Sequence, residues 1–241
     1  MAGDVYTVAG GKGGVGKTTT VVNTAIALQD AGRRTVVVDA DLGMTNLSEL
    51  LGIDHEPRLH DVLAGEAELA DAIAEGPKDV SVLAGRGTLE AFAEADPSNL
   101  QPVLRALRRS YETVIVDTGA GLSHETLVPA GMSDGIVLVT TPDEVSLTDV
   151  KKVGELAERV DGRVVGAVLT KVRDDIDVSA VGDELGQEIL GVVPQDDVAT
   201  ENEPLVVTSP DSYAAQAYRR LGAKLAGGSD EPAAERPVES R

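Results

Sequence analysis

The sequence of 241 residues contains no cysteine and no tryptophan, and only one phenylalanine. The absence of cysteine excludes disulfides, thiolate metal sites, iron–sulfur clusters and a cysteine nucleophile. Aromatic residues make up 2% of the chain, so we expect an aliphatic core of Val, Leu, Ile and Ala. The chain has no run of about 18 apolar residues that would predict a transmembrane helix, and its first residues lack the pattern of a signal peptide. We therefore expect a cytoplasmic protein.

Positive charge is also scarce. Seven lysines and fourteen arginines stand against 41 acidic residues, which gives a net charge of −20. The acids are spread along the whole chain, and this favours a solvated acidic surface suited to high salt over a dedicated basic partner. Sequence-independent DNA binding rests mainly on Lys and Arg contacting phosphates, so this composition disfavours DNA binding.

Short Val-rich runs alternate with helical patterns along the chain. Six runs predict strands at residues 4–9, 34–40, 79–84, 112–118, 135–141 and 163–170, and "ILGVVP" and "PLVVTS" are candidates for two more. They are apolar almost throughout, as parallel strands are when both of their faces are covered. This alternation predicts an α/β fold with a doubly wound, mostly parallel sheet and helices on both faces.

The predicted helices span residues 18–32, 99–110, 145–160 and 213–225, and the first is expected to end at Gly32. Three of them carry an apolar face at helical spacing. These faces are Leu100, Val103, Leu104 and Leu107; Val145, Val150, Val153, Leu156 and Val160; and Tyr213, Ala217, Leu221 and Leu225. We expect one domain over residues 1–226 and a disordered acidic tail over 227–241.

The stretch "AGGKGGVGKTTT", residues 9–20, follows the first predicted strand and opens the first predicted helix. Gly11, Gly16, Lys17 and Thr18 satisfy the pattern G-x-x-x-x-G-K-[ST]. Glycines let successive backbone N–H groups point at phosphate oxygens, and the helix N-terminus adds the favourable end of its dipole. Lys17 is expected to reach the β- and γ-phosphates, and the Thr18 hydroxyl to bind Mg²⁺.

Aspartates end two of the predicted strands. Asp39 and Asp41 follow "TVVV", and Asp117 follows "TVIV". Ligands of doubly wound sheets bind beyond the carboxyl ends of the strands. These carboxylates should therefore lie above the phosphates.

The pattern K-G-G-x-G-K-T-T at residues 12–19 resembles the deviant Walker A loop of the MinD/ParA family of P-loop ATPases, and the resemblance covers about residues 4–226. It implies that ATP is bound by Gly11, Lys12, Gly13, Gly14, Val15, Gly16, Lys17, Thr18 and Thr19. It also implies a homodimer in the ATP state, in which Lys12 crosses the interface and contacts the partner's phosphates. A cation delivered in this way would assist phosphoryl transfer as an arginine finger does.

The segment with Asp39, Asp41, Gly43, Asn46 and Leu47 is similar to the family's switch I. The resemblance implies that Asp41 is catalytic, orienting or deprotonating the attacking water and helping to hold the Mg²⁺ water shell. The segment "VIVDTGAG" is similar to the Walker B and switch II segment, with Asp117 contacting Mg²⁺ through water and Gly121 near the nucleotide. Gly119 stands where the family has proline, which loosens this loop.

At the purine end the family often has N-[KR]-x-R, and here the text is "TKVR". The resemblance places Thr170, Lys171 and Pro194 around the adenine. Thr170 can form one hydrogen bond but cannot make the two-point contact of an asparagine amide.

The resemblance implies a slow ATPase, stimulated by dimerisation or a partner, that serves as a MinD-like switch for the spatial positioning of the division site or other cellular structures. An activating or cargo protein is expected as its partner. The alternatives are a ParA-like partition ATPase and a P-loop metabolic synthetase or kinase. Residues 227–241 have neither the apolar face nor the cationic edges of a membrane-binding amphipathic helix, so we expect no direct membrane binding.

Overall fold

A single sheet lies at the centre of the computed structural model, which describes residues 2–86, 96–121, 124–173, 176–196 and 202–227. Its eight strands follow the order β3-β4-β2-β5-β1-β6-β7-β8. All neighbouring pairs are parallel except β3 and β4 at one edge. The strands are β1 (Asp4–Gly10), β2 (Thr35–Asp39), β3 (Ala74–Glu75), β4 (Ser81–Leu83), β5 (Thr113–Ala120), β6 (Gly135–Thr140), β7 (Val164–Val172) and β8 (Ile189–Pro194). The predicted fold class is confirmed.

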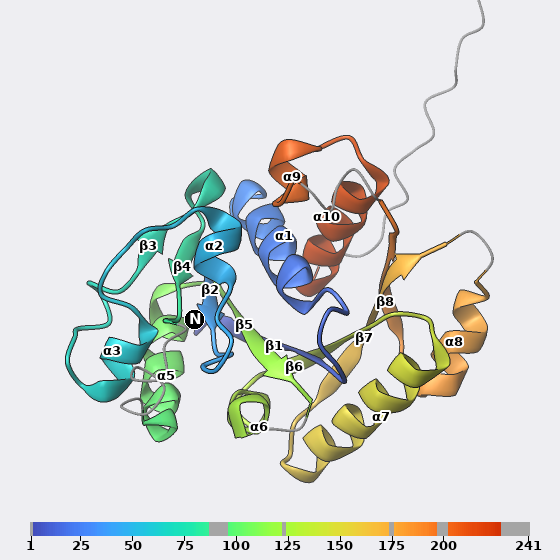
Figure 1. Ribbon diagram of the computed structural model, residues 1–241, viewed down its shortest axis with the longest axis horizontal. Helices are drawn as coiled ribbons and strands as arrows, with labels where there is room; N and C mark the ends of the chain where they lie inside the picture. Colours follow the sequence, from blue (N-terminus) through green and yellow to red (C-terminus); the bar gives the residue numbers. More distant parts are fainter. Residues whose placement is uncertain (1, 87–95, 122–123, 174–175, 197–201, 228–241) are drawn as a thin grey trace, which may run out of the picture.

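Helices cover both faces of this sheet. In Figure 1, α1 and α10 lie on one side of it, and α5, α6 and α7 lie on the other. The α-helices are α1 (Lys17–Asp30), α2 (Leu47–Leu51), α3 (Leu59–Ala64), α5 (Leu100–Ser110), α6 (His124–Ala130), α7 (Glu144–Arg159), α8 (Val178–Leu185), α9 (Leu205–Thr208) and α10 (Tyr213–Leu225), with 3₁₀ turns η1 (Pro77–Asp79) and η2 (Pro97–Asn99). Within the described ranges, no helix is both long and apolar enough to cross a bilayer.

The core is aliphatic apart from the buried Tyr218, and it consists of separate clusters on the two faces of the sheet. In β2, the side chain of Val37 packs with α1 and α10, whereas Val36 and Val38 pack with α3 and α5 on the opposite face. Successive side chains of a strand point to opposite faces, so a strand covered on both sides must be apolar at every position. This requirement explains the Val-rich runs.

The predicted strands agree with the structure except for one of the two shorter runs. The six longer runs correspond to β1, β2, β4, β5, β6 and β7, and "ILGVVP" forms β8. The expectation that "PLVVTS" is a strand is wrong, because Leu205–Thr208 forms the short helix α9. The backbone N–H of Val206 donates to the Asn23 side chain at 2.9 Å instead of to a neighbouring strand.

The predicted helices are confirmed, but two residues assigned to their apolar faces are exposed. Val145 is 63% exposed and Tyr213 is 78% exposed. Both lie in the first turn of their helices and face solvent, whereas the buried residues of those turns are Ser146 and Leu147 in α7 and Ala214 and Ala215 in α10. Helix α1 ends as expected, with Gly32 in the left-handed conformation at φ 84°. Residues 228–241 of the expected tail lie outside the described residues.

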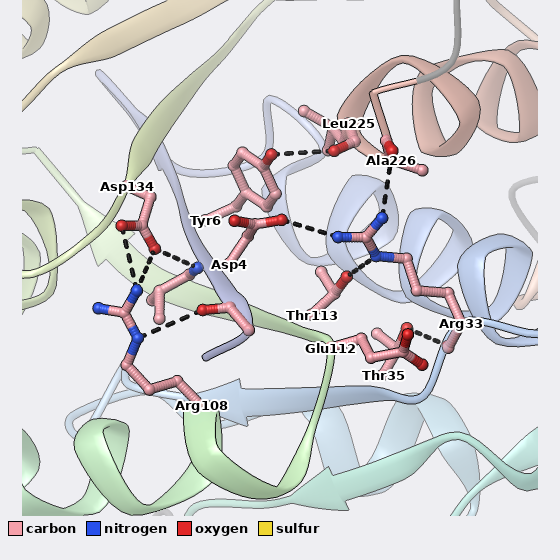
Figure 2. Close-up of polar contacts among 12 residues, drawn as sticks. Asp4, Tyr6, Arg33, Thr35, Arg108, Glu112, Thr113, Asp134, Leu225 and Ala226 are labelled. Atoms are coloured by element: carbon pink, nitrogen blue, oxygen red, sulfur yellow. Dashed lines mark hydrogen bonds and ion pairs between the residues drawn. The ribbon is translucent and has the colours of Figure 1, made fainter. Parts of the chain in front are cut away.

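Arg33, between α1 and β2, links three segments at the edge of the sheet where β1 and β5 begin (Figure 2). Its guanidinium donates hydrogen bonds to the Asp4 carboxylate and the Thr113 hydroxyl, both at 2.7 Å, and to the Ala226 carbonyl at 3.1 Å. The Tyr6 hydroxyl donates to the neighbouring carbonyl of Leu225 at 2.9 Å. The end of α10 is thereby fixed to the first strand.

On the other side of β1, Asp134 has a corresponding role. Its carboxylate accepts hydrogen bonds from the backbone N–H of Val5 at 2.8 Å and from Arg108 at 3.1 Å. Arg108 also donates to the Gly3 carbonyl at 3.2 Å (Figure 2). This pair connects α5 to the start of the central strand.

Replacing Arg33 by alanine should destabilise the fold, because it removes three hydrogen bonds from a side chain that is only 24% exposed. We expect Arg33→Ala to lower the free energy of unfolding by about 1–3 kcal/mol. Denaturant titration followed by far-ultraviolet circular dichroism suits a chain without tryptophan.

Arg34→Ala is the matched control. Its side chain is 68% exposed and contacts Glu112 at 3.8 Å. Its loss should change the same free energy by less than about 0.5 kcal/mol. Equal effects of the two substitutions would show that the Arg33 network does not hold these segments.

Candidate functional site

A glycine-rich loop connects β1 to α1 at the carboxyl edge of the sheet. Gly14 and Gly16 adopt left-handed conformations, at φ 76° and 92°, which favour glycine. A Cβ at Gly11 would lie 2.5 Å from the backbone of Asp149, so this residue packs directly on α7. Around Gly13 and Gly14, in contrast, nothing lies within 4 Å of where a Cβ would be. The loop is therefore tightly packed at its base and open at its tip, next to the N-terminus of a long helix.

Lys17, the first residue of α1, is buried under this loop and is only 8% exposed. Burial lowers the pKa of its ammonium group, while the carboxylates of Asp117 and Asp41 act in the opposite direction. Its positive charge therefore lies between the glycine loop and the carboxylates of Asp117 and Asp41. An ammonium group in this position can bind an anion held by the loop N–H groups.

Asp39 and Asp117 face each other across neighbouring strands. They are paired in the register of β2 and β5, and they are 0% and 1% exposed. Burial, followed by the charge of Asp117, raises the pKa of Asp39 well above its usual range. Burial also raises the pKa of Asp117 to about 6, although a hydrogen bond with Thr18 and the charge of Lys17 favour its ionised form.

Each of these two carboxyl groups has one oxygen, Oδ1, that is buried and has no hydrogen-bond partner among the described residues. Buried polar atoms without partners are uncommon, and they often mark the place of a ligand or an ion. No cluster of three or more acidic or histidine side chains that could hold a metal by itself occurs in the parts of the chain that the structure describes. The residues instead fit Mg²⁺, which keeps several waters and is bound through one or two protein groups and the phosphates of a nucleotide.

Asp41 lies on the loop that follows β2, at intermediate exposure. Its carboxylate accepts a hydrogen bond from the backbone N–H of Met44 at 3.1 Å. Thr18, one residue after Lys17, contributes its hydroxyl next to Asp117. The structure thus brings Lys17, Thr18, Asp41 and Asp117 together, as the sequence predicts.

Lys12 does not point at this cluster in the single chain. Its ammonium group forms an ion pair with Asp143 at 3.3 Å, and its side chain is 40% exposed. Asp143 caps the N-terminus of α7, and hydrogen bonds from Ser146, Thr141 and Lys12 hold the pKa of its carboxyl below the usual range. Lys12 is therefore bound to its own chain on the outer side of the loop.

The residues expected near the adenine lie at the ends of β7 and β8. Thr170 is 3% exposed and its hydroxyl donates to the Val15 carbonyl at 2.6 Å, whereas the Lys171 ammonium donates to the Gly14 carbonyl at 2.7 Å. Pro194 pairs with Val172 in the sheet register. Both Thr170 and Lys171 thus contact the glycine loop.

Gly121 lies on the opposite side of the loop. Its backbone N–H donates to the Gly10 carbonyl at 3.0 Å, and its φ of 84° is left-handed. Gly121, the residue after β5, is therefore attached directly to the start of the glycine loop.

Sequence reasoning missed a buried pair behind the loop. Asn23 of α1 is 0% exposed and donates to the Glu203 carboxylate at 2.8 Å and to the Thr19 carbonyl at 2.9 Å. Burial raises the pKa of Glu203. The pair connects α1 to the segment before α9. An asparagine within the apolar helix sequence "VVNTAIAL" is the signal that could have indicated a buried polar contact.

Comparisons with known proteins found a matching family model and similar sequences. Residues 6–204 match the family model described as the CobQ/CobB/MinD/ParA nucleotide binding domain. An uncharacterised ATP-binding protein of Methanocaldococcus jannaschii is 38% identical over 241 residues, which cover 97% of this chain and 91% of the relative.

Two solved structures are also similar. The cell division ATPase MinD of Pyrococcus furiosus has a TM-score of 0.89 and 36% identity, covering 93% of this chain and 99% of that one. The septum site-determining protein MinD of Pyrococcus horikoshii, complexed with Mg-ADP, has a TM-score of 0.86 and 35% identity, covering 92% and 95%.

Asp117→Asn should stabilise the protein in the absence of ligand at neutral pH. An acid whose pKa is raised by folding favours the folded state when it is protonated, below about pH 4, and this contribution is lost as the pH rises through about 6. The asparagine variant should therefore be more stable than the wild type by about 1–3 kcal/mol at pH 7.5, and the gap should narrow toward pH 4. Denaturant titrations at both pH values measure this.

Asp211→Asn, at an exposed position, removes the same charge and serves as the control. It should change the free energy of unfolding by less than about 0.5 kcal/mol. An Asp117→Asn protein that is less stable than the wild type at pH 7.5, with a gap that does not vary with pH, would contradict the proposed cost of burying this carboxylate.

Proposed function

Because the chain belongs to the CobQ/CobB/MinD/ParA family of nucleotide-binding domains, we propose that it is a MinD-like ATPase whose nucleotide state controls dimerisation. The observation that carries the proposal is the position of Lys17. It is buried between the glycine loop and the carboxylates of Asp117 and Asp41, at the N-terminus of α1. Such a site binds a polyphosphate with its Mg²⁺.

ATP with Mg²⁺ is the proposed ligand. The M. jannaschii relative is named for ATP binding, and the P. horikoshii relative is complexed with Mg-ADP. In this chain Lys17 would neutralise the β- and γ-phosphates, and the loop N–H groups would bind their oxygens. Thr18 would ligate Mg²⁺ directly, and Asp117 would hold a water of the metal shell.

Hydrolysis is assigned to Asp41 and to Lys12 of a second copy. Asp41 lies on a loop at intermediate exposure, where its carboxylate can orient a water against the γ-phosphate. Lys12 is held by Asp143 in the single chain, and that contact is exposed. An exposed ion pair contributes about 0–1 kcal/mol, so Lys12 can exchange Asp143 for the partner's phosphates at little cost.

Two exposed apolar side chains support this mode of association. Met44 is 78% exposed and lies three residues after Asp41, and Val145 is 63% exposed and lies two residues after Asp143. Single exposed apolar residues are common on protein surfaces. These two flank the groups that we assign to the closed dimer, where a second copy would cover them.

The dimer would act as a switch for spatial positioning. ATP binding would close two chains around two nucleotides, and slow hydrolysis would reopen them, so that a surface formed only by the dimer recruits an activating or cargo protein. The net charge of −20 argues against nucleic acid as this partner.

Two lysine substitutions should separate nucleotide binding from dimerisation. Lys17→Ala should weaken ADP and ATP binding by roughly 100-fold or more, because it removes charge-assisted contacts in a buried site. Lys12→Ala should retain ADP affinity within about three-fold, because its partner in the single chain is Asp143, and one exposed ion pair contributes little. It should, however, abolish ATP-dependent dimerisation. Calorimetry measures binding, and light scattering measures the dimer.

Lys152→Ala provides the matched control for Lys12. Lys152 forms an exposed ion pair with Asp149 at 3.1 Å within α7. The Lys152→Ala protein should form the ATP-dependent dimer as the wild type does. A Lys12→Ala protein that dimerises as well as Lys152→Ala would remove Lys12 from the interface.

Asp41→Ala should bind ATP and form a long-lived dimer, because it lacks the group that orients water but keeps Lys17 and Thr18. We expect ATP turnover to fall by about 10²-fold or more, the size of effect that a positioned acid or base contributes. Phosphate release, together with chromatography of the ATP-bound protein, measures both properties. The trapped dimer is also the form to use for capturing a partner. Normal phosphate release by this variant, or transfer of phosphate to a small molecule instead of water, would contradict the assignment.

A further inference from the structure

The carboxyl end of β7 departs from regular pairing at Thr170 and Lys171. Along the ladder between β7 and β8, Leu169 pairs with Val192, and the next pair is Val172 with Pro194. Between these two pairs the chain advances by three residues on β7 but by only two on β8. The extra residue on β7 makes this a β-bulge. Within it Lys171 takes a φ of 53°, a left-handed conformation that is uncommon for lysine. Bulges of this kind redirect side chains beside functional sites.

The bulge directs both side chains at the glycine loop. Thr170 is 3% exposed, and its hydroxyl lies 2.6 Å from the Val15 carbonyl and 3.2 Å from the Thr140 carbonyl. A hydroxyl has one hydrogen to donate, and the shorter contact is to the loop. Lys171 donates from its ammonium group to the Gly14 carbonyl at 2.7 Å. Two consecutive carbonyls of the loop therefore have donors on β7.

These contacts determine where the loop N–H groups point. The carbonyl of one residue and the N–H of the next belong to the same planar, trans peptide, and they point in opposite directions. Holding the carbonyls of Gly14 and Val15 against β7 aims the N–H groups of Val15 and Gly16 away from β7. In a phosphate-binding loop these N–H groups contact the ligand oxygens.

We propose that Thr170, assisted by Lys171, is a positioning residue for the nucleotide phosphates, and that it does not recognise the adenine base. This inference rests on the proposed nucleotide-binding function and assigns a different role to a residue expected at the purine. The buried Thr170 hydroxyl is directed at backbone carbonyls, so it is already engaged. Loss of this hydroxyl would lower the affinity for every ligand that carries the phosphates, whichever base is attached to them.

The test compares Thr170→Val and Thr170→Ser with the wild type by calorimetry, using Mg-ADP, Mg-GDP and inorganic tripolyphosphate with Mg²⁺. Valine keeps the shape of threonine without the hydroxyl. We expect Thr170→Val to lower the affinity for each ligand that the wild type binds, and to lower all of these affinities by the same factor of about 5 to 20. Serine keeps the hydroxyl and should restore affinity to within about three-fold of the wild type. Lys171→Met should lower the affinity for tripolyphosphate by only about two- to five-fold, because the contact of the Lys171 ammonium group with the Gly14 carbonyl is exposed.

Thr140→Val is the matched control. Thr140 ends the neighbouring strand β6, is 0% exposed, and donates its hydroxyl to the Thr141 carbonyl instead of to the loop. It should bind all three ligands like the wild type.

Three outcomes would overturn the proposal. If Thr170→Val weakens Mg-ADP but leaves tripolyphosphate unchanged, Thr170 contacts the base. If Thr170→Val binds every ligand as tightly as the wild type, the hydroxyl does not position the loop. If Thr170→Val and Thr140→Val lose affinity equally, the effect is general packing. A wild-type protein that binds none of the three ligands would instead refute the proposed function itself, and the role of Thr170 with it.

Discussion

The site depends on one buried arrangement of charge. Lys17 is 8% exposed and lies beside Asp117, which is 1% exposed. On the neighbouring strand, the fully buried Asp39 is the register partner of Asp117. Water does not solvate these groups, so burial lowers the pKa of the lysine and raises the pKa of both acids. Buried charges of this kind contribute little to stability, and they mark functional sites. A phosphate would balance the charge of Lys17, and Mg²⁺ would balance the charge of the carboxylates.

The rest of the fold holds these charges in place. Apolar side chains on both faces of β2 and β5 hold the two strands in place, and their pairing sets Asp39 opposite Asp117. The glycine loop is attached to its surroundings through backbone carbonyls, at Gly10 by Gly121 and at Val15 by Thr170. Its tip at Gly13 and Gly14 stays open. Lys12 lies outside this arrangement on an exposed contact with Asp143. The fixed part of the site suits binding, and the exposed lysine suits a change of partner.

Features that depend on local sequence could be predicted. Contacts between residues that are far apart in the sequence could not. Strands buried on both faces require continuous Val-rich runs, and the phosphate loop requires its glycines, so both are visible in the sequence. Thr170 contacts a carbonyl 155 residues away, through a bulge that no local pattern indicates. The Lys12–Asp143 and Asn23–Glu203 contacts also join distant segments. Val145 and Tyr213 fit a helical period but face solvent in the first turns of α7 and α10, where Leu147 and Ala214 are the side chains that enter the core.

The most direct test of this account is the stability of the wild-type protein with Mg²⁺ alone, ADP alone, and both together at saturating concentrations. Mg²⁺ alone lacks the phosphate ligands, and ADP alone adds negative charge beside Asp39 and Asp117. The account predicts that the two together raise the free energy of unfolding by more than the sum of their separate effects, as linked binding to the folded state requires. Strictly additive effects, or no stabilisation by the pair, would contradict it.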